Sequence, residues 1–328
     1  MPDGDTTRQG RTLRTPRALR DAGLLPAHAE AAAAAVAERF AISVTDHVAG
    51  LIDPADPADP IARQYIPDAA ELTTAPHETD DPTADAPFTP VKGVVHRYPD
   101  RALLKPLLAC PVYCRFCFRR EVVGPDGGVL TEAELDTAIA WFERTPAIRE
   151  AILTGGDPFM LSARRLGPIL ARLAAIPHIE TLRIHTRVPV ADPARIDAAL
   201  LDALRPGKPV FVAVHANHAR EFAPAATAAI GRLADAGVAL LGQSVLLRGV
   251  NDSAAALEDL FRAMLRTRVK PYYLHALDAA PGTARFAVPD AEGLALLRSL
   301  RGRLPGHALP CFVRELPQGG GKRPVEAS

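Results

Sequence analysis

From residue 91 onward, short apolar runs alternate with longer segments in which apolar residues recur at helical spacing. Each apolar run predicts a buried β-strand; the runs cover residues 102–108, 150–153, 181–185, 210–215, 239–246 and 270–274. Each amphipathic segment predicts a helix; these cover residues 131–144, 162–175, 192–204, 218–236 and 252–268. The first helix should begin with a capping box, because Glu134 follows Thr131 at the required spacing.

The alternation of strand and helix predicts right-handed βαβ units and a parallel sheet, hence an α/β fold. Six predicted strands are too few for a full eight-stranded barrel. A partial, open (β/α) barrel and a doubly wound sheet both satisfy the pattern, and periodicity alone does not separate them. In either architecture the active site lies at the carboxyl ends of the strands.

The first ninety residues differ from this pattern. They contain an alanine-rich helical stretch at residues 30–40 and the sequence DPADPADP at 53–60, whose prolines break helices and strands alike. We therefore divide the chain into a helical and linker extension (1–90), a barrel (91–308) and a C-terminal strand with a glycine-rich segment (309–328).

The charge balance excludes several classes of partner. Lys and Arg together number 38, as do Asp and Glu, so no net field draws the chain to nucleic acid or to an anionic membrane. The longest apolar runs are shorter than a membrane span, and the N-terminus MPDGDTTRQGR lacks the apolar core of a signal peptide. A small-molecule partner and a cytoplasmic location are expected.

Three of the four cysteines, Cys110, Cys114 and Cys117, lie within eight residues, directly after the first predicted strand. This spacing is not a disulfide framework. Three thiolates in one loop can bind three irons of a cubane [4Fe–4S] cluster and leave the fourth iron open. Structural zinc is the alternative, but such sites usually have paired C-x2-C knuckles, and no second knuckle occurs in the sequence.

A cluster of inert, buried thiols is a further alternative. Three nearby arginines, Arg115, Arg119 and Arg120, argue against burial of the loop. The fourth cysteine, Cys311, lies in the apolar stretch LPCFV and is expected to be a small buried thiol.

The C-x3-C-x2-C spacing resembles that of the radical S-adenosylmethionine (SAM) superfamily. Further motifs resemble the lysine 2,3-aminomutase family in the same order; they are HRYPDR (96–101), CPVYCRFCFRR (110–120), TGGDP (154–158), NH (217–218), GQSVLLRGVND (242–252), PYYLHALD (271–278) and GGGKRPV (319–325). The resemblance covers most of the chain from about residue 60 onward. It implies a partial (β/α)6 barrel of the radical SAM type, with a [4Fe–4S] cluster, SAM and pyridoxal 5′-phosphate as cofactors and an external one-electron reductant.

Alone, GGGKRPV would predict a flexible tail, because three glycines favour disorder. The resemblance instead implies that Lys322 is the catalytic lysine that binds pyridoxal phosphate as a Schiff base. It also implies that Arg97 and Arg101 bind the phosphate of that cofactor, a role suited to guanidinium groups. Without it, both arginines would be assigned equally well to the solvated surface.

The resemblance further implies that Gly155, Gly156 and Asp157 contact SAM at the end of the second strand. Taken alone, this GGD sequence predicts only a turn that ends a strand. His215 and Gln243, at the ends of later strands, match cofactor contacts in the family. Polar residues at strand ends are often loop anchors, which is the alternative for this pair.

The substrate implied by the resemblance is L-lysine. Arg119 matches the arginine that binds the substrate carboxylate, and Asp278 and Glu315 match two carboxylates that bind its ε-ammonium group. A pair of carboxylates in one pocket favours a cation over an acidic amino acid. Asp278 could instead cap the turn before Pro281. A mutase for another amino acid, or a non-catalytic iron–sulfur protein of the same fold, are the alternative functions.

One departure concerns oligomerisation. Ser253 stands where the long lysine-degrading mutases have a zinc-binding cysteine, so a homo-oligomer would form without intersubunit zinc. The short tail after Lys322, together with CFRR and LHALD, resembles the branch that makes β-lysine for modification of translation elongation factor P.

Overall fold

The computed structural model describes residues 12–124, 127–317 and 321–326. Within them a nine-stranded sheet has the order β11-β10-β9-β8-β7-β6-β5-β4-β3. Its strands are β3 (Val94–Tyr98), β4 (Arg101–Leu107), β5 (Glu150–Gly155), β6 (Thr181–Thr186), β7 (Val210–His215), β8 (Ala239–Val245), β9 (Lys270–His275), β10 (Cys311–Leu316) and β11 (Gly321–Pro324). Residues 1–11, used above to exclude a signal peptide, and Gly319 and Gly320 of the glycine-rich motif lie outside the described ranges.

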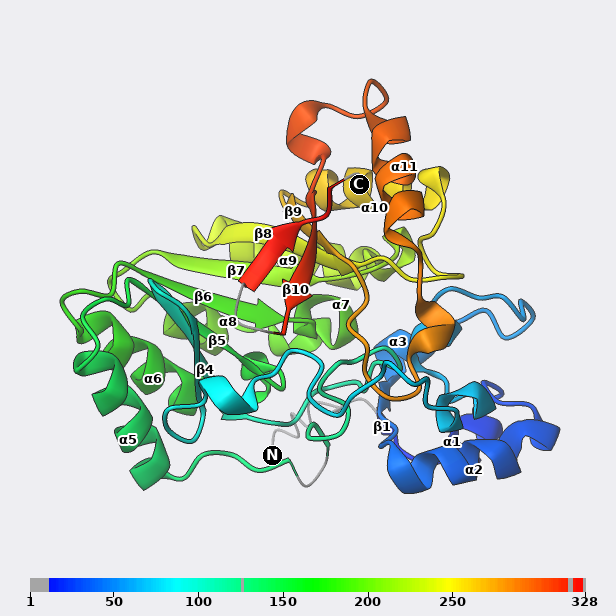
Figure 1. Cartoon of the computed structure of the whole chain (residues 1–328), viewed down its shortest axis with the longest axis horizontal. Helices are drawn as coiled ribbons and strands as arrows, with labels where there is room; N and C mark the ends of the chain where they lie inside the picture. Colours follow the sequence, from blue (N-terminus) through cyan, green and yellow to red (C-terminus); the bar gives the residue numbers. More distant parts are fainter. Residues whose placement is uncertain (1–11, 125–126, 318–320, 327–328) are drawn as a thin grey trace, which may run out of the picture.

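Strands β4 to β10 run parallel, whereas β3 and β11 pair antiparallel at the two edges. The six apolar runs are thereby confirmed as β4 to β9. The sheet curls into a nearly closed barrel (Figure 1). The prediction of an α/β fold with a partial barrel is confirmed. Of the nine strands, periodicity did not identify β3 or β11, and β10 lies in the C-terminal segment (309–328) in which a strand was expected.

The principal helices cover the outer face of this sheet (Figure 1). They are α5 (Glu132–Glu143), α6 (Ala163–Ala175), α8 (Ala198–Ala203), α9 (Pro224–Asp235), α10 (Ala254–Arg266) and α11 (Asp290–Leu300). The capping box of α5 is confirmed, since the Thr131 hydroxyl accepts from the Glu134 amide while the Glu134 carboxylate accepts from the Thr131 amide. The helix predicted at 192–204 is shorter, because the 3-10 turn Pro193–Arg195 precedes α8.

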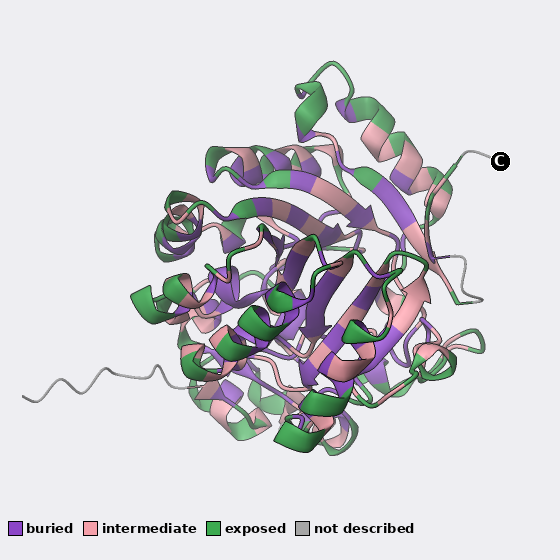
Figure 2. Ribbon diagram, turned by 90° about the vertical axis from the view of Figure 1, so that its left-hand side faces the viewer, coloured by how far each residue is buried: buried purple, intermediate pink, exposed green. Residues whose placement is uncertain are grey.

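Both faces of the central strands are buried, as continuous apolar runs require. In β5 the residues from Ala151 to Thr154 are all buried. Figure 2 shows burial concentrated in the strands, with exposed residues on the surrounding helices. No helix within the described residues is both long and apolar enough to cross a membrane.

The extension folds around a second apolar cluster. It contains α1 (Pro16–Asp21), α2 (Glu30–Arg39), α3 (Asp46–Ala49), α4 (Ala62–Tyr65) and the strand pair β1 (Thr12–Leu13) and β2 (Val44–Thr45). The cluster includes Val112 from the cysteine loop and Ala191, which follows β6. The extension therefore packs against the carboxyl ends of the barrel strands, where the site is expected. The helix predicted at 30–40 is confirmed as α2.

Side chains join the two edges of the sheet. Arg97 on β3 donates to Glu315 on β10 at 2.8 Å, and the backbone N–H of Lys322 on β11 donates to the Tyr98 hydroxyl. Gly321 has a φ of 65°, and a Cβ there would lie 2.5 Å from the Tyr98 ring. We call this contact between β3 and β10/β11 the seam; it closes the barrel where the described residues form no backbone ladder.

Replacing Tyr98 with Phe tests the seam. The variant keeps the ring against Gly321 but removes the acceptor of the Lys322 amide, which should cost about 0.5–1.5 kcal/mol of local stability. We expect the Lys322 amide to exchange its hydrogen up to about tenfold faster. The Val325 amide, which donates to the Phe312 carbonyl at 2.9 Å, is the internal control. Equal acceleration at both amides would mean that the whole edge has loosened.

Candidate functional site

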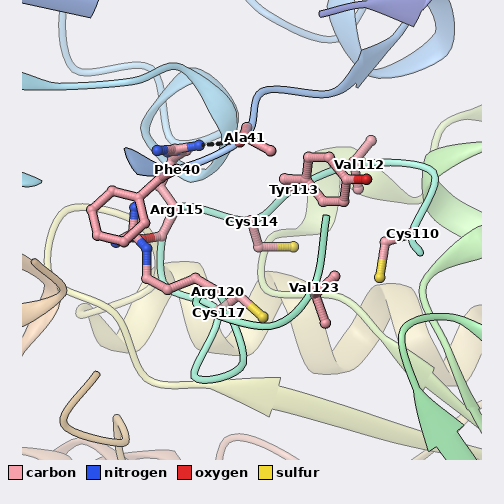
Figure 3. A pocket seen from close by; sticks show the side chains of 10 residues that line it. All are labelled: Phe40, Ala41, Cys110, Val112, Tyr113, Cys114, Arg115, Cys117, Arg120 and Val123. Atoms are coloured by element: carbon pink, nitrogen blue, oxygen red, sulfur yellow. Dashed lines mark hydrogen bonds between the residues drawn. The ribbon is translucent and has the colours of Figure 1, made fainter. Parts of the chain in front are cut away.

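The three clustered cysteines line one pocket in the loop between β4 and α5. The sulfur atoms of Cys110, Cys114 and Cys117 face the space that this loop encloses (Figure 3). The other residues that line the pocket are Phe40, Ala41, Val112, Tyr113, Arg115, Arg120 and Val123. The extension thus supplies one wall of the pocket, and the cysteine loop supplies the rest.

Burial raises the pKa of all three thiols, and that of Cys114 to about 11. Arg187, which follows β6, opposes this at one position, because its Nη1 donates to Cys114 Sγ at 3.1 Å. Arg187 is itself buried and ion-paired with Glu221. Metal binding here would displace thiol protons, and Arg187 is placed to stabilise the resulting thiolate.

The cysteine set fits a cluster held by three thiolates. In a cubane each cysteine binds a different iron, so the sulfur atoms need not converge on one ion. In the described part of the chain, no group of three or more His, Cys, Asp or Glu side chains surrounds a single metal position. Cys311 is exposed at the first residue of β10, at the opposite end of the parallel strands. The expectation that it is buried was wrong, and it is not placed to be a fourth ligand.

Two arginines of the cysteine loop, Arg115 and Arg120, are buried and Arg119 is partly buried, which corrects the interpretation that they keep the loop exposed. The side chains of Arg115, Arg120 and Arg119 are 1, 4 and 13% exposed. Arg115 and Arg120 both pair with Glu71, and Arg119 pairs with Asp85 at 3.1 Å. Buried carboxylates from the extension therefore allow the arginines to leave solvent.

The GGD sequence holds the start of the cysteine loop. The Gly156 amide donates to the Leu107 carbonyl at 2.8 Å, and the Asp157 amide donates to the Ala109 carbonyl at 2.9 Å. A Cβ on Gly156 would lie 2.3 Å from the Ala109 carbonyl oxygen. Gly155 has a φ of 109°, which favours glycine. These glycines are thus required by the close approach of the backbone that leads into Cys110.

The Asp157 side chain is a buried structural acceptor. Its carboxylate accepts from the Thr186 hydroxyl at 2.7 Å and from the backbone amides of Phe159, Arg187 and Val188. Burial raises the pKa of Asp157, and these hydrogen bonds oppose the shift. Asp157 therefore links the end of β5 to the end of β6.

A chain of ion pairs runs from the cysteine loop to the predicted cofactor lysine. Asp85 pairs with Arg119 at 3.1 Å and with Arg97 at 3.0 Å. Glu315 pairs with Arg97 and with the Lys322 ammonium, both at 2.8 Å. Burial alone would raise the pKa of Asp85, but its cationic neighbours, Arg119 foremost, hold it at about 2. Four of the predicted site residues and Asp85 therefore lie in one network.

Asp278 lies in the same electrostatic environment, after β9. Burial and the neighbouring Glu315 carboxylate raise the pKa of Asp278 to about 6, while Lys322 and Arg119 oppose the shift. The predicted pair of carboxylates is thus brought together with Lys322, and Arg119 connects this region to the cysteines.

Histidines near the ends of three strands carry buried nitrogens. Burial lowers the pKa of His185, His215 and His275, that of His275 to about 3 with a contribution from Lys322. The Nε2 atoms of His185, His215 and Gln243 have no hydrogen-bond partner among the described residues. Because buried polar atoms are normally satisfied, these atoms fit contact with a polar ligand.

Arg101 lies apart from that network. Its guanidinium stacks on the Tyr98 ring at 4.5 Å and lies 3.6 Å from Asp100. Its side chain is 37% exposed. Arg101 therefore lies next to the seam: it stacks on Tyr98, whose hydroxyl accepts from the Lys322 amide.

Several residues of the site were missed from the sequence. His185 and His275 could have been found, because they end strands as His215 does. Arg187, immediately after a strand, carried a weaker signal of the same kind. Asp85 carried none, since it lies in an irregular segment before the 3-10 turn Ala86–Phe88. Ser253 caps α10 by accepting from the Ala256 amide.

Comparison with known proteins identifies relatives over most of the chain. The Radical SAM superfamily profile matches residues 104–261. The L-lysine 2,3-aminomutase of Clostridium subterminale is 41% identical over 87% of this chain and 68% of its own length. The L-lysine 2,3-aminomutase of Escherichia coli is 37% identical over 88% of this chain and 84% of its own. The glutamate 2,3-aminomutase of Clostridioides difficile is 34% identical, over 88 and 68% respectively.

Replacing Gly156 with Ala tests the anchoring of the cysteine loop. The new Cβ would overlap the backbone of Ala109, so the start of the loop must move, at a cost of about 1–3 kcal/mol. We expect a lower melting temperature and at least a twofold loss of iron and sulfide per chain after anaerobic reconstitution. Gly124→Ala is the control, because nothing lies within 4 Å of a Cβ at that position. Full iron content in the Gly156 variant would contradict the anchoring role.

Replacing Asp278 with Asn tests the raised pKa. A carboxyl group with a raised native pKa favours the folded state below its unfolded pKa near 4, and this contribution is lost as pH rises through about 6. Relative to wild type, Asp278→Asn should therefore gain on the order of 1–3 kcal/mol between pH 4.5 and 7.5, measured by urea unfolding. The control Asp290→Asn removes a half-exposed partner of Arg314. A wild-type-to-variant difference that stays constant with pH would contradict titration of Asp278 in this range.

Proposed function

The chain belongs to the lysine 2,3-aminomutase family of the radical SAM superfamily, and on that premise we propose that it converts L-lysine to β-lysine by moving the amino group from carbon 2 to carbon 3. The observation that carries the proposal is the ion-pair network that extends from Arg119, two residues after Cys117, to Lys322. The network links the end of the cysteine loop to the proposed cofactor lysine and to Glu315, and Asp278 lies in the same electrostatic environment; this arrangement matches the requirements of the reaction.

The three cofactors would be held by different parts of the barrel mouth. Cys110, Cys114 and Cys117 would bind the [4Fe–4S] cluster, whose open iron is the position for SAM. Residues at or near the ends of the strands would contact SAM; they are Gly155, Gly156, Asp157, His215 and Gln243. The buried nitrogens of His215 and Gln243 support this assignment.

Lys322 would bind pyridoxal phosphate, and Arg97 and Arg101 would bind its phosphate. The Arg97 side chain is only 6% exposed and pairs with Asp85 and Glu315, so a bound phosphate would take the place of one of these carboxylates. When bound, the cluster with SAM supplies one-electron hydrogen abstraction, and pyridoxal phosphate holds the migrating amino group. The barrel's own contribution is to orient the substrate and to exclude water from the reacting atoms.

Lysine is favoured as the substrate by the charges at the far end of the pocket. Arg119 would bind the α-carboxylate, and Asp278 and Glu315 would bind the ε-ammonium. A second carboxylate on the substrate would meet like charge there, which opposes glutamate. A mutase for another amino acid is the competing function, because a glutamate 2,3-aminomutase is among the relatives. An external one-electron reductant and a reducing, cytoplasmic environment that keeps the thiols reduced complete the proposal.

Anaerobic turnover tests the function. With cluster, SAM, pyridoxal phosphate and dithionite, we expect β-lysine from L-lysine and at least about tenfold less product from L-glutamate. Chiral separation would give the configuration of the β-lysine and thereby distinguish the branch of the long lysine-degrading mutases from the elongation factor P branch. Lys322→Ala should lose β-lysine formation by at least about a thousandfold and lose the visible absorbance of bound pyridoxal phosphate. Release of 5′-deoxyadenosine in that variant would show that its cluster is intact.

Lys92→Ala is the matched control, because Lys92 is 72% exposed and pairs only with the helix-capping residue Glu134 among the contacts described. Product from glutamate but not from lysine would replace the proposed substrate. If neither Lys322→Ala nor Lys92→Ala loses the visible absorbance, another residue binds the cofactor.

A further inference from the structure

The extension contacts the backbone of the cysteine loop at several points. The Tyr113 amide donates to the Ser43 carbonyl at 3.1 Å, and the Ser43 hydroxyl donates to the Pro111 carbonyl at 2.8 Å. The Arg115 amide donates to the Gln64 carbonyl at 2.8 Å. The loop that carries the three thiols is therefore shaped by residues 43–64 as well as by the barrel.

Glu71 is the charged centre of this contact. It lies in the 3-10 turn Ala69–Leu72 and its side chain is fully buried. Arg115 donates to its two oxygens from Nε at 3.0 and 2.9 Å. Arg120 donates to Oε2, and Arg285, which lies after β9, donates to Oε1 at 3.4 Å. One carboxylate is thus shared by three guanidinium groups, two of them from the cysteine loop.

These two arginines line the same pocket as the thiols. Arg115 follows Cys114 in the chain, and both Arg115 and Arg120 line the cysteine pocket (Figure 3). Arg120 Nη1 also donates to the Arg115 carbonyl at 2.9 Å, and its guanidinium stacks on Phe40 at 3.5 Å. A change in charge at Glu71 therefore changes the electrostatic potential at the wall of the pocket.

We propose that Glu71 is a positioning residue for the iron–sulfur cluster: it holds Arg115 and Arg120 against the cysteine loop and sets the net charge beside the cluster, and thereby its reduction potential. The proposal rests on the cluster assigned under the proposed function, and it gives the extension a role in electron transfer. Arg285 also pairs with Asp68 at 2.8 Å, so the three arginines with Glu71 and Asp68 leave one uncompensated positive charge. Positive charge stabilises the reduced cluster, which carries one more electron, and the Glu71 carboxylate limits that stabilisation.

Two substitutions that shift the charge in opposite directions test this. Glu71→Gln removes a negative charge and should raise the midpoint potential, increasing the reduced-to-oxidised ratio at a fixed potential about tenfold, which is 59 mV for one electron. Arg285→Gln removes a positive charge from the outer side of Glu71 and should lower the ratio at least about twofold. The measurement is an electrochemical titration of the reconstituted protein followed by electron paramagnetic resonance, without lysine or pyridoxal phosphate.

Controls separate this effect from loss of structure. Asp59→Asn removes another buried carboxylate of the extension, which pairs with Arg220 at 2.7 Å, and should leave the potential unchanged. Glu71→Asp keeps the charge and should restore most of the wild-type potential. Unchanged potentials in both Glu71→Gln and Arg285→Gln, or shifts of the same sign, would overturn the proposal. If Glu71→Gln does not take up a cluster, the midpoint potential of Arg285→Gln decides: a lower potential supports the proposal, and an unchanged or higher one overturns it. Failure of the wild type to bind a cluster would instead refute the proposed function.

Discussion

Neutralising buried guanidinium groups is the constraint on which the surroundings of the cysteine loop depend. Four arginines lie around the three thiols; they are Arg115, Arg119, Arg120 and Arg187. A charge removed from water without a partner costs several kcal/mol, so each must meet a carboxylate. Glu71 and Asp85 come from the extension, and Glu221 follows β7. Arg187 is thus paired within the barrel, whereas Arg115, Arg119 and Arg120 are paired only when the extension is assembled on the loop.

The sequence predicts this fold where burial leaves a local signal. Strands covered on both faces are continuous apolar runs, as β5 to β7 show, and β4 and β8 add alternating buried positions, which is why these strands were identified with nearly correct bounds. β3 escaped notice because its second half, His96 to Tyr98, is half-buried and polar. The ion-pair partners could not be predicted, since Glu71 and Arg115 are separated by 44 positions and nothing in either neighbourhood identifies the other. The three loop arginines were therefore wrongly expected to face solvent.

For the candidate site, the family resemblance supplied the residues and the structure supplied their mutual arrangement. The resemblance named Lys322, Glu315 and Arg97 individually, without indicating that they contact one another. Strand register explains why they do: Glu315 and Lys322 are paired across β10 and β11, and the curl of the sheet brings Arg97 to the same carboxylate. Arg119, two residues after Cys117, is linked to this group through Asp85, which pairs with both Arg119 and Arg97.

The seam between β3 and β10/β11 has a thermodynamic consequence. In a barrel closed by a backbone ladder, main-chain hydrogen bonds stabilise the closure. This barrel is instead closed by contacts of Arg97, Tyr98, Glu315 and Lys322. A small molecule that binds these side chains becomes part of the wall and bridges strands from the two ends of the sheet. Its binding free energy is then added directly to the free energy of unfolding. Closure of the barrel is therefore coupled to ligand binding at its mouth, and the concentration of the ligand governs both.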